Sequence, residues 1–239
     1  MPEAIIGRKD YEYKEHFRLF TDYSDEKQLL REAVMHYFQP SFRQTFLDVG
    51  AGDGAITIPI AKKVAKTIAI EPNTKFAEHL QANGIIVLPQ KIQETPLTET
   101  FNLILMSHAL YYIPYPLWYP TITNLYQHLI PKGKMCLIVF GGRGDWHDLH
   151  ESFFKAEGFT VEQPDVLVLN LAKNGITVTR KDVETHYELP LEQAITFISY
   201  FLNVPEKRKE EFRQRLQAKT TNGICKINAY HTLLMMEKP

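Results

Sequence analysis

The sequence predicts an α/β fold in which a mainly parallel β-sheet carries helices on both faces. Short apolar runs alternate with segments of helical periodicity between residues 46 and 140. Alternation at this spacing is typical of the strand–helix–strand units that build a parallel sheet. A glycine-rich turn at residues 50–54 directly follows the first apolar run, as expected where a buried strand leads into a helix.

Composition excludes several classes of protein. The chain has 239 residues, of which 44% are hydrophobic and 23% charged, so it can bury a core without disulfides or metals. Lys plus Arg total 27 and Asp plus Glu total 28, a net charge of −1, so no global field attracts nucleic acid or an anionic membrane. No apolar run has signal-peptide or membrane-spanning length. With only Cys136 and Cys225 as cysteines, we expect a cytoplasmic protein.

The first half of the chain supplies most of the expected sheet. We expect a short helix over residues 8–20 and a second over residues 26–37, which Ser24 or Asp25 caps and Pro40 ends. Apolar runs predict strands at residues 46–49, 67–70, 85–88, 101–106 and 135–140. Amphipathic segments between them predict helices at residues 55–64, 75–82 and 121–129, and Pro131–Gly133 predicts a turn.

After residue 140 the alternation becomes irregular. Helical patterns occur at residues 145–156, 164–172, 192–201 and 206–218, and strand patterns at residues 183–189 and 230–236. We expect one domain over residues 1–239. It carries an N-terminal helical cap over residues 1–40 and a partly helical lobe over residues 142–222, which includes the sixth strand.

The glycine turn is a candidate ligand site. Glycines let the backbone approach a ligand closely, and the helix N-terminus behind them favours negative groups. Gly50, Gly52 and Ala55 match the dinucleotide fingerprint G-x-G-x-x-A. Asp48 with Gly50, Gly52 and Gly54 also resembles motif I of the class I methyltransferases that use S-adenosyl-L-methionine (SAM). An NAD(P)-dependent oxidoreductase therefore stays open beside a methyltransferase.

Glu71 ends the second predicted strand. A carboxylate there can accept both hydroxyls of a ribose, and both enzyme classes use one. The resemblance to methyltransferases is strengthened by Asp48 and by the order of a sixth strand, helices and a seventh strand. In the methyltransferase fold the last strand inserts antiparallel between strands five and six. The resemblance thus implies a Rossmann-like, seven-stranded sheet with its last strand antiparallel, and a small helical acceptor-binding lobe.

Short motifs along most of the chain resemble the histamine N-methyltransferase-like family. They are residues 13–20 and 24–28 near the N-terminus, residues 107–113 after the fourth strand, residues 142–149 after the fifth, and residues 227–237 at the end. The resemblance implies a cofactor-binding set for SAM, consisting of Asp48, Gly50, Ala51, Gly52, Glu71, Pro72, Ile92, Gln93 and Ser107. In it, Glu71 holds the ribose, Ile92 and Gln93 flank the adenine, and Ser107 meets the methionine portion.

The same resemblance implies a substrate-binding set around an acid. Its members are Tyr13, Phe17, Glu26, Tyr111, Tyr112, Trp146 and Asn228. An acid among aromatic rings suits a small cation, so we expect N-methylation of a small amine or imidazole, with neither nucleic acid nor a membrane as partner. O-methylation or other small-molecule methylation, and a non-catalytic SAM-binding protein, stay open. The histidines show no H-E-x-x-H spacing, so we expect no metal site.

His108 departs from this family, which has a glutamine at that position. A protonated amine has no lone pair to attack a methyl group, so an N-methyltransferase must bind or create the neutral nucleophile. A histidine titrates in the right range to take that proton, which makes His108 the candidate catalytic residue. The alternative is a structural histidine. Likewise Tyr13, Phe17 and Trp146 can simply pack, and Glu26 can simply complement a helix dipole.

Overall fold

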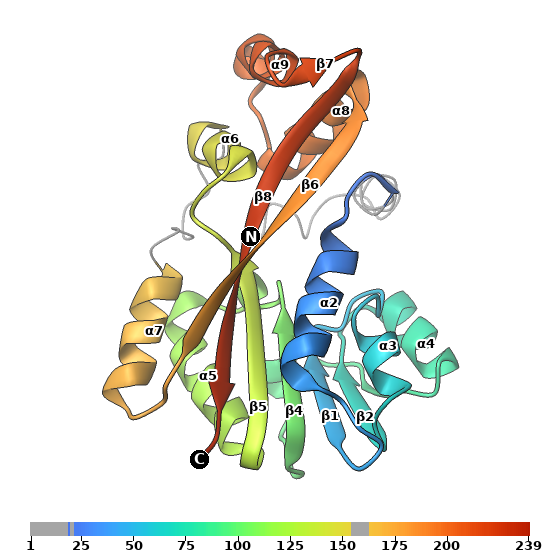
Figure 1. Cartoon of the computed structure of the whole chain (residues 1–239), viewed down its shortest axis with the longest axis vertical. Coiled ribbons are helices and arrows are strands. Elements are labelled where there is room, and N and C mark those ends of the chain that lie inside the picture. Colours follow the sequence, from blue (N-terminus) through green and yellow to red (C-terminus); the bar gives the residue numbers. More distant parts are fainter. Residues whose placement is uncertain (1–18, 20–21, 154–162) are drawn as a thin grey trace. The chain divides into compact units, whose positions relative to one another are not determined.

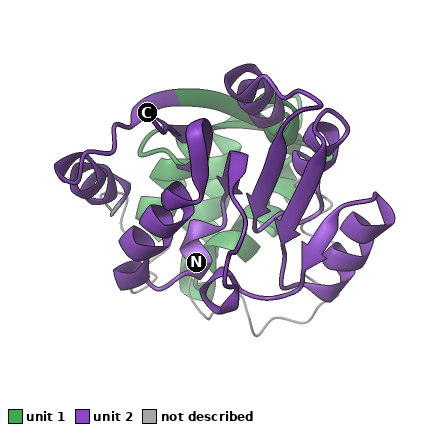
Figure 2. Ribbon diagram, turned by 90° about the horizontal axis from the view of Figure 1, so that it is seen from below, with its two compact units in different colours: residues 1–29, 140–159, 182–231 green, residues 30–139, 160–181, 232–239 purple. Residues whose placement is uncertain are grey.

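The computed structural model describes residue 19, residues 22–153 and residues 163–239 (Figure 1). The chain divides into two compact units (Figure 2). Unit 1 comprises residues 1–29, 140–159 and 182–231, and unit 2 comprises residues 30–139, 160–181 and 232–239. Helix α2 and strands β6 and β8 contribute residues to both units. Among the described residues, no helix is both long and apolar enough to cross a membrane.

Unit 2 is built on parallel strands. They are β1 Thr45–Val49, β2 Lys66–Ile70, β3 Ile86–Leu88, β4 Phe101–Ser107 and β5 Leu129–Phe140. They lie in the order β3-β2-β1-β4-β5, and each pair is parallel. Leu47 in β1 stands opposite Ile68 of β2 and Ile104 of β4. All three side chains are buried, which explains why these strands read as continuous apolar runs rather than alternating ones.

The helices of this unit form largely where the sequence predicts them. They are α2 Glu26–Phe38, α3 Thr57–Ala61, α4 Thr74–Ala82, α5 Trp118–Gln127 and α7 Gln163–Lys173. The side chain of Asn73 caps α4 by accepting from the backbone N–H groups of its first turn. Helix α3 is shorter than the predicted 55–64, because the backbone after Ala61 closes tighter turns, such as Lys63 N–H to Ile60 O at 2.8 Å.

Strand β5 includes the segment Pro131–Gly133, which the sequence predicts to be a turn before the strand. The strand begins at Leu129, ahead of that segment. Its pairing with β4 shifts register between the pairs Phe101–Leu129 and Leu103–Lys134. An irregularity of this kind holds extra residues outside the ladder while pairing continues on both sides. The segment therefore forms a bulge within the strand instead of a separate loop.

Unit 1 contains three further α-helices, a 3₁₀ helix and most of two long strands among its described residues. The elements are α6 Asp145–Phe153, β6 Thr179–Pro190, α8 Leu191–Leu202, the 3₁₀ helix η4 Glu206–Arg208, α9 Lys209–Gln217, β7 Thr220–Thr221 and β8 Ile224–Glu237. Strand β8 lies between β5 and β6 and runs in the opposite direction to both (Figure 1). Within the described residues the strands form one eight-stranded sheet, with β7 paired to β8. The predicted Rossmann-like α/β fold is confirmed.

Candidate functional site

The turn between β1 and α3 depends on glycine. Gly50 and Gly52 have φ angles of +76° and +55°, a region that L side chains rarely adopt. A Cβ added to Gly50 would lie 2.4 Å from Cβ of Ala109, in the segment after β4. Gly50 therefore allows the β1 turn and this segment to touch. A Cβ added to Gly52 would meet no described atom within 4 Å, so the turn presents open space at that residue.

Asp48 fixes the base of this turn. It lies in β1 and is 2% exposed. Its Oδ2 accepts a hydrogen bond of 2.6 Å from the Thr57 hydroxyl, at the start of α3. Asp48 thus connects the strand before the turn to the helix after it.

Glu71 reaches the turn from the end of β2. Its Oε2 accepts from the backbone N–H of Gly52 at 2.8 Å, and its Oε1 accepts from that of Asn73 at 2.8 Å. Burial raises the pKa of the Glu71 carboxyl above its ordinary value. The hydrogen bonds from the two backbone N–H groups lower this pKa, but by less than burial raises it. Two backbone donors thus hold the Glu71 side chain beside the turn.

The other predicted cofactor residues gather at one edge of unit 2. Ser107 ends β4, and Pro72 directly follows Glu71. Ile92 and Gln93 lie in the 3₁₀ helix η1 Ile92–Glu94, which follows β3. Because parallel strands end at the same edge of a sheet, all these residues lie at the carboxyl edge, where ligands bind in open α/β sheets.

His108 occupies a strained position at the same edge. Its φ is +51°, and a residue other than glycine pays about 1–3 kcal/mol for such a backbone. Its backbone N–H donates to Ile138 O at 3.0 Å, so β5 holds it in place. Its ring stacks on that of Tyr111, with centroids 6.1 Å apart. Tyr111 is buried, whereas its neighbour Tyr112 is 52% exposed.

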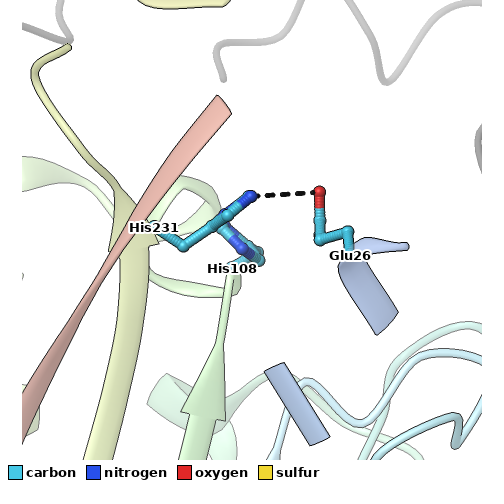
Figure 3. Close-up of side chains that lie close together, drawn as sticks. All are labelled: Glu26, His108 and His231. Atoms are coloured by element: carbon cyan, nitrogen blue, oxygen red, sulfur yellow. Dashed lines mark ion pairs between the residues drawn. The ribbon is translucent and has the colours of Figure 1, made fainter. Parts of the chain in front are cut away.

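Unit 1 surrounds Glu26 with polar partners. Glu26 begins α2, and the Ser24 hydroxyl accepts its backbone N–H at 3.0 Å, as the expected cap would. Only 2% of Glu26 is exposed. The Tyr187 hydroxyl donates to Glu26 Oε2 at 2.7 Å. His231 Nε2 lies 3.4 Å from the same oxygen (Figure 3). Figure 3 also labels His108, which belongs to unit 2.

The electrostatics of these partners follow from burial. Burial and the adjacent Glu26 carboxylate raise the pKa of Tyr187 well above 10, so its hydroxyl keeps its proton and donates. Burial lowers the pKa of His231, and the Glu26 carboxylate only partly opposes this. His231 is therefore neutral at physiological pH.

Trp146 lies in the aromatic core of unit 1. Its ring stacks on Phe140 with centroids 6.1 Å apart and on Tyr187 with centroids 5.5 Å apart. It also contacts Phe197, and 9% of the residue is exposed. Its packing role is thus evident, and through Tyr187 it lies one residue away from Glu26.

Asn228 caps helix α6. Its side-chain oxygen accepts from the backbone N–H of Asp145 at 2.8 Å, and its own backbone N–H donates to Asp145 Oδ2 at 3.2 Å. Its amide nitrogen donates to Glu184 Oε1 at 2.7 Å. Both ends of the Asn228 amide are therefore engaged within unit 1. The predicted substrate residues Tyr13 and Phe17 lie outside the described residues.

Sequence reasoning missed Tyr187, His231 and Thr185. Thr185 and Tyr187 are two residues apart in β6, and Ala229 and His231 are two apart in β8. Residues at this spacing share one face of a strand, and all four are buried. The period-two alternation of residues along β6 and β8 could have identified these positions as buried. It does not indicate that Tyr187 and His231 contact Glu26.

The family of the chain follows from a sequence comparison. The family described as "Methyltransferase domain" matches residues 17–181, which is more than half of the chain. The chain belongs to this methyltransferase family. Membership of this family explains the glycine turn and Glu71 better than the alternative of an NAD(P)-dependent oxidoreductase does. No curated protein sequence matches the chain, and the finer resemblance to histamine N-methyltransferase-like proteins stays a prediction.

Solved structures share the fold of this methyltransferase. A Bacillus halodurans protein, provisionally assigned as a methyltransferase, is 16% identical with a TM-score of 0.63, over 87% of this chain and 98% of that one. The N-methyltransferase NodS from Bradyrhizobium japonicum, in complex with S-adenosyl-L-homocysteine, is 13% identical with a TM-score of 0.52, over 99% and 91%. Magnesium protoporphyrin IX methyltransferase from Synechocystis, with bound SAM, is 12% identical with a TM-score of 0.53, over 98% and 86%.

Proposed function

We propose that this methyltransferase transfers the methyl group of SAM to a small basic acceptor, an amine or an imidazole. The choice of SAM as the methyl donor rests on the contact between Glu71 and Gly52 at the carboxyl edge of the parallel strands. A nucleoside needs a carboxylate for its ribose and a glycine turn for its close approach. Fold relatives with bound SAM or S-adenosyl-L-homocysteine support the same choice of donor.

The residues present fit the cofactor. Each Glu71 carboxylate oxygen accepts one backbone N–H, and an ionised carboxylate has about four acceptor positions, so ribose hydroxyls can still bind. A Cβ placed on Gly52 would meet no described atom within 4 Å, so a ligand can approach the backbone of the turn there. Ile92 and Gln93 would flank the adenine, and Ser107 would contact the methionine end. SAM supplies an activated methyl group on its sulfonium.

The protein contributes alignment and exclusion of water. Transfer is an in-line displacement, so most of the rate gain comes from holding the nucleophile opposite the methyl group. His108 follows β4 at the same edge as the glycine turn, and its backbone is fixed by the bond to Ile138 O. We assign it the role of taking the acceptor's proton, which frees the lone pair.

The basic character of the acceptor rests on unit 1, which contains most of the predicted acceptor lobe. Glu26 is a buried acid, and a buried carboxylate is stabilised by a cation more strongly than an exposed one. The Tyr187 hydroxyl donates to this carboxylate, and the Tyr187 ring stacks on that of Trp146, so the acid adjoins an aromatic cluster. Fold relatives act on acceptors as different as magnesium protoporphyrin IX, so O-methylation of a small molecule is the second candidate.

Calorimetry with SAM and NADH tests the donor. We expect the purified protein to bind SAM and S-adenosyl-L-homocysteine and to give no heat with NADH, because the turn and Glu71 lie in a methyltransferase domain. A mass-shift screen of small amines, imidazoles and alcohols with SAM then identifies the acceptor class. Binding of NADH without SAM would refute the proposal, and methylation of alcohols alone would favour the second candidate.

A second test concerns His108. If it accepts the proton, kcat rises through the range where an ordinary imidazole loses its proton, about pH 6–7.5. His108→Gln should lose this limb and keep SAM affinity within a few fold. The matched control is His79→Gln, on the exposed side of α4, which should keep both. An unchanged pH profile in His108→Gln would make this histidine a structural residue.

A further inference from the structure

We propose that Tyr112 is a further SAM-binding residue, whose phenol donates a hydrogen bond to the ribose that Glu71 holds. This inference rests on the proposed function and deepens it, because it moves Tyr112 from the predicted acceptor site to the cofactor site. Tyr112 ends the 3₁₀ helix η2 Leu110–Tyr112, which follows β4. Tyr112 and Glu71 both lie in unit 2, so the arrangement belongs to one compact body.

The sheet places Tyr112 and Glu71 on opposite sides of the glycine turn. Strand β1 lies between β2 and β4, and the three strands are parallel, so their carboxyl ends meet at one edge. Glu71 follows β2, the glycine turn follows β1, and η2 follows β4. Neighbouring strands are about 4.8 Å apart, so β2 and β4 are about 10 Å apart. This separation is within the combined reach of a glutamate and a tyrosine side chain.

Contacts of the glycine turn fix both residues beside it. Ala109 touches the turn, since a Cβ on Gly50 would lie 2.4 Å from Cβ of Ala109. The backbone N–H of Tyr112 donates to Ala109 O at 3.2 Å, so Tyr112 lies one 3₁₀ turn beyond that contact. On the other side, the N–H of Gly52 donates to Glu71 Oε2 at 2.8 Å.

The phenol of Tyr112 lies near the Glu71 carboxylate. The residue is 52% exposed. Burial nevertheless raises the pKa of the Tyr112 phenol, and the negative charge of Glu71 raises it further. A carboxylate disfavours the phenolate in this way when it is close to the phenol. The ring therefore accounts for much of the exposure, and the hydroxyl keeps its proton and remains a donor.

The neighbouring ring of Tyr111 points in another direction. A 3₁₀ helix has three residues per turn, so consecutive side chains diverge by about 120°. Tyr111 is buried, and its ring stacks on that of His108 with centroids 6.1 Å apart. One tyrosine of the pair thus packs beside the candidate proton acceptor. The other, Tyr112, remains available to a ligand beside Glu71.

A ribose diol suits the two groups that the turn brings together. Its hydroxyls donate to the Glu71 carboxylate, which only accepts, and their oxygens keep lone pairs that can accept in turn. The Tyr112 hydroxyl supplies a donor for one of these oxygens. The Tyr112 ring also shields the diol from water, and hydrogen bonds to a charged group are stronger where water is excluded.

The first experiment compares two ligands that share the ribose. S-adenosyl-L-homocysteine and 5′-methylthioadenosine, which lacks the amino acid portion, are titrated by calorimetry into the wild-type protein and into Tyr112→Phe. We expect Tyr112→Phe to weaken both ligands by the same factor, about 3–10-fold, as for one lost hydrogen bond. Tyr112→Ala should weaken both further, because it also removes the ring.

Tyr115 supplies the matched control. It lies in the 3₁₀ helix η3 Tyr115–Leu117, directly after η2, and is 40% exposed. Tyr115→Phe should therefore bind both ligands as the wild type does. Urea unfolding of Tyr112→Phe and Tyr115→Phe should give the wild-type midpoint, which excludes a general loss of structure as the cause of weaker binding.

The second experiment uses the wild-type protein alone. Hydroxyl-radical footprinting, read by tandem mass spectrometry, measures how fast each exposed tyrosine ring is oxidised. S-adenosyl-L-homocysteine should slow the oxidation of Tyr112 severalfold, because the ligand covers the exposed ring. The oxidation of Tyr115 should stay unchanged.

The results separate this inference from the proposed function. Wild-type affinity in Tyr112→Phe, or unchanged oxidation of Tyr112 with ligand, would overturn the assignment. A loss with S-adenosyl-L-homocysteine that is absent with 5′-methylthioadenosine would also overturn it, by moving the phenol to the methionine portion. Equal losses in Tyr115→Phe would show a general effect on the segment after β4. In each case the methyltransferase proposal stands while the wild type binds SAM, and a wild type that binds no SAM overturns both.

Discussion

Gly50→Ala lowers the free energy of unfolding by about 2–5 kcal/mol, through backbone strain of about 1–2 kcal/mol and overpacking of about 1–3 kcal/mol. The strain arises because φ at this residue is +76°. The overpacking arises because the new Cβ would lie 2.4 Å from Cβ of Ala109. Urea unfolding followed by circular dichroism measures this change. The urea concentration at the midpoint should fall, and the slope of the unfolding free energy against urea concentration should stay the same.

Gly84 offers the matched control for this prediction. It has a similar φ of +78°, but a Cβ there would meet no described atom within 4 Å. Gly84→Ala should therefore cost only the strain, about 1–2 kcal/mol. Adding Ala109→Gly to Gly50→Ala should recover the packing part of the loss and leave the strain. Equal losses at Gly50 and Gly84, or no recovery in the double variant, would refute the close approach of the two segments.

Glu71→Ala weakens the binding of SAM by about 1.5–3 kcal/mol, or about 10–150-fold, the loss expected for hydrogen bonds to a charged group. Two effects contribute. The ribose hydroxyls lose their acceptor, and the N–H of Gly52 loses the carboxylate oxygen that holds the turn. Calorimetry with SAM and with S-adenosyl-L-homocysteine should show similar losses, because the two ligands share the ribose.

An exposed acid in the same unit controls for charge alone. Glu78 lies on the outer side of α4, and Glu78→Ala should leave SAM affinity unchanged. A Glu71→Ala protein that unfolds normally and binds SAM as well as the wild type would remove Glu71 from the ribose site. The methyltransferase family would still hold, since it rests on residues 17–181 as a whole.

The two predictions concern one piece of structure. Gly50 lets the turn after β1 touch the segment after β4, and Glu71 holds Gly52 from the end of β2. Three neighbouring strand ends are therefore connected around the place where SAM is proposed to bind. A site connected in this way is largely formed before the cofactor arrives, which reduces the entropy lost on binding.

Local patterns account for what could be predicted of this region. Strand β1 forms at Thr45–Val49, one residue longer than the predicted 46–49, and α4 begins one residue before its predicted start. Strand β8 is much longer than predicted, from Ile224 instead of residue 230. Buried residues already alternate with more exposed ones over residues 225–230, so a stricter use of period-two alternation would have found the missing part.

By itself the sequence determined the fold class and the place of Glu71 beside the glycine turn, because both depend on short contiguous segments. A strand, a glycine turn and a helix follow one another, and the rule that parallel strands end at one edge brings Glu71 to Gly52. Only the tertiary structure decided the surroundings of Glu26. Tyr187 lies 161 residues further along the chain, and it reaches Glu26 through the pairing of β6 with the residues before α2. Hydrophobic patterning specifies which face of a strand is buried, but the partner and register of that strand arise from long-range pairing.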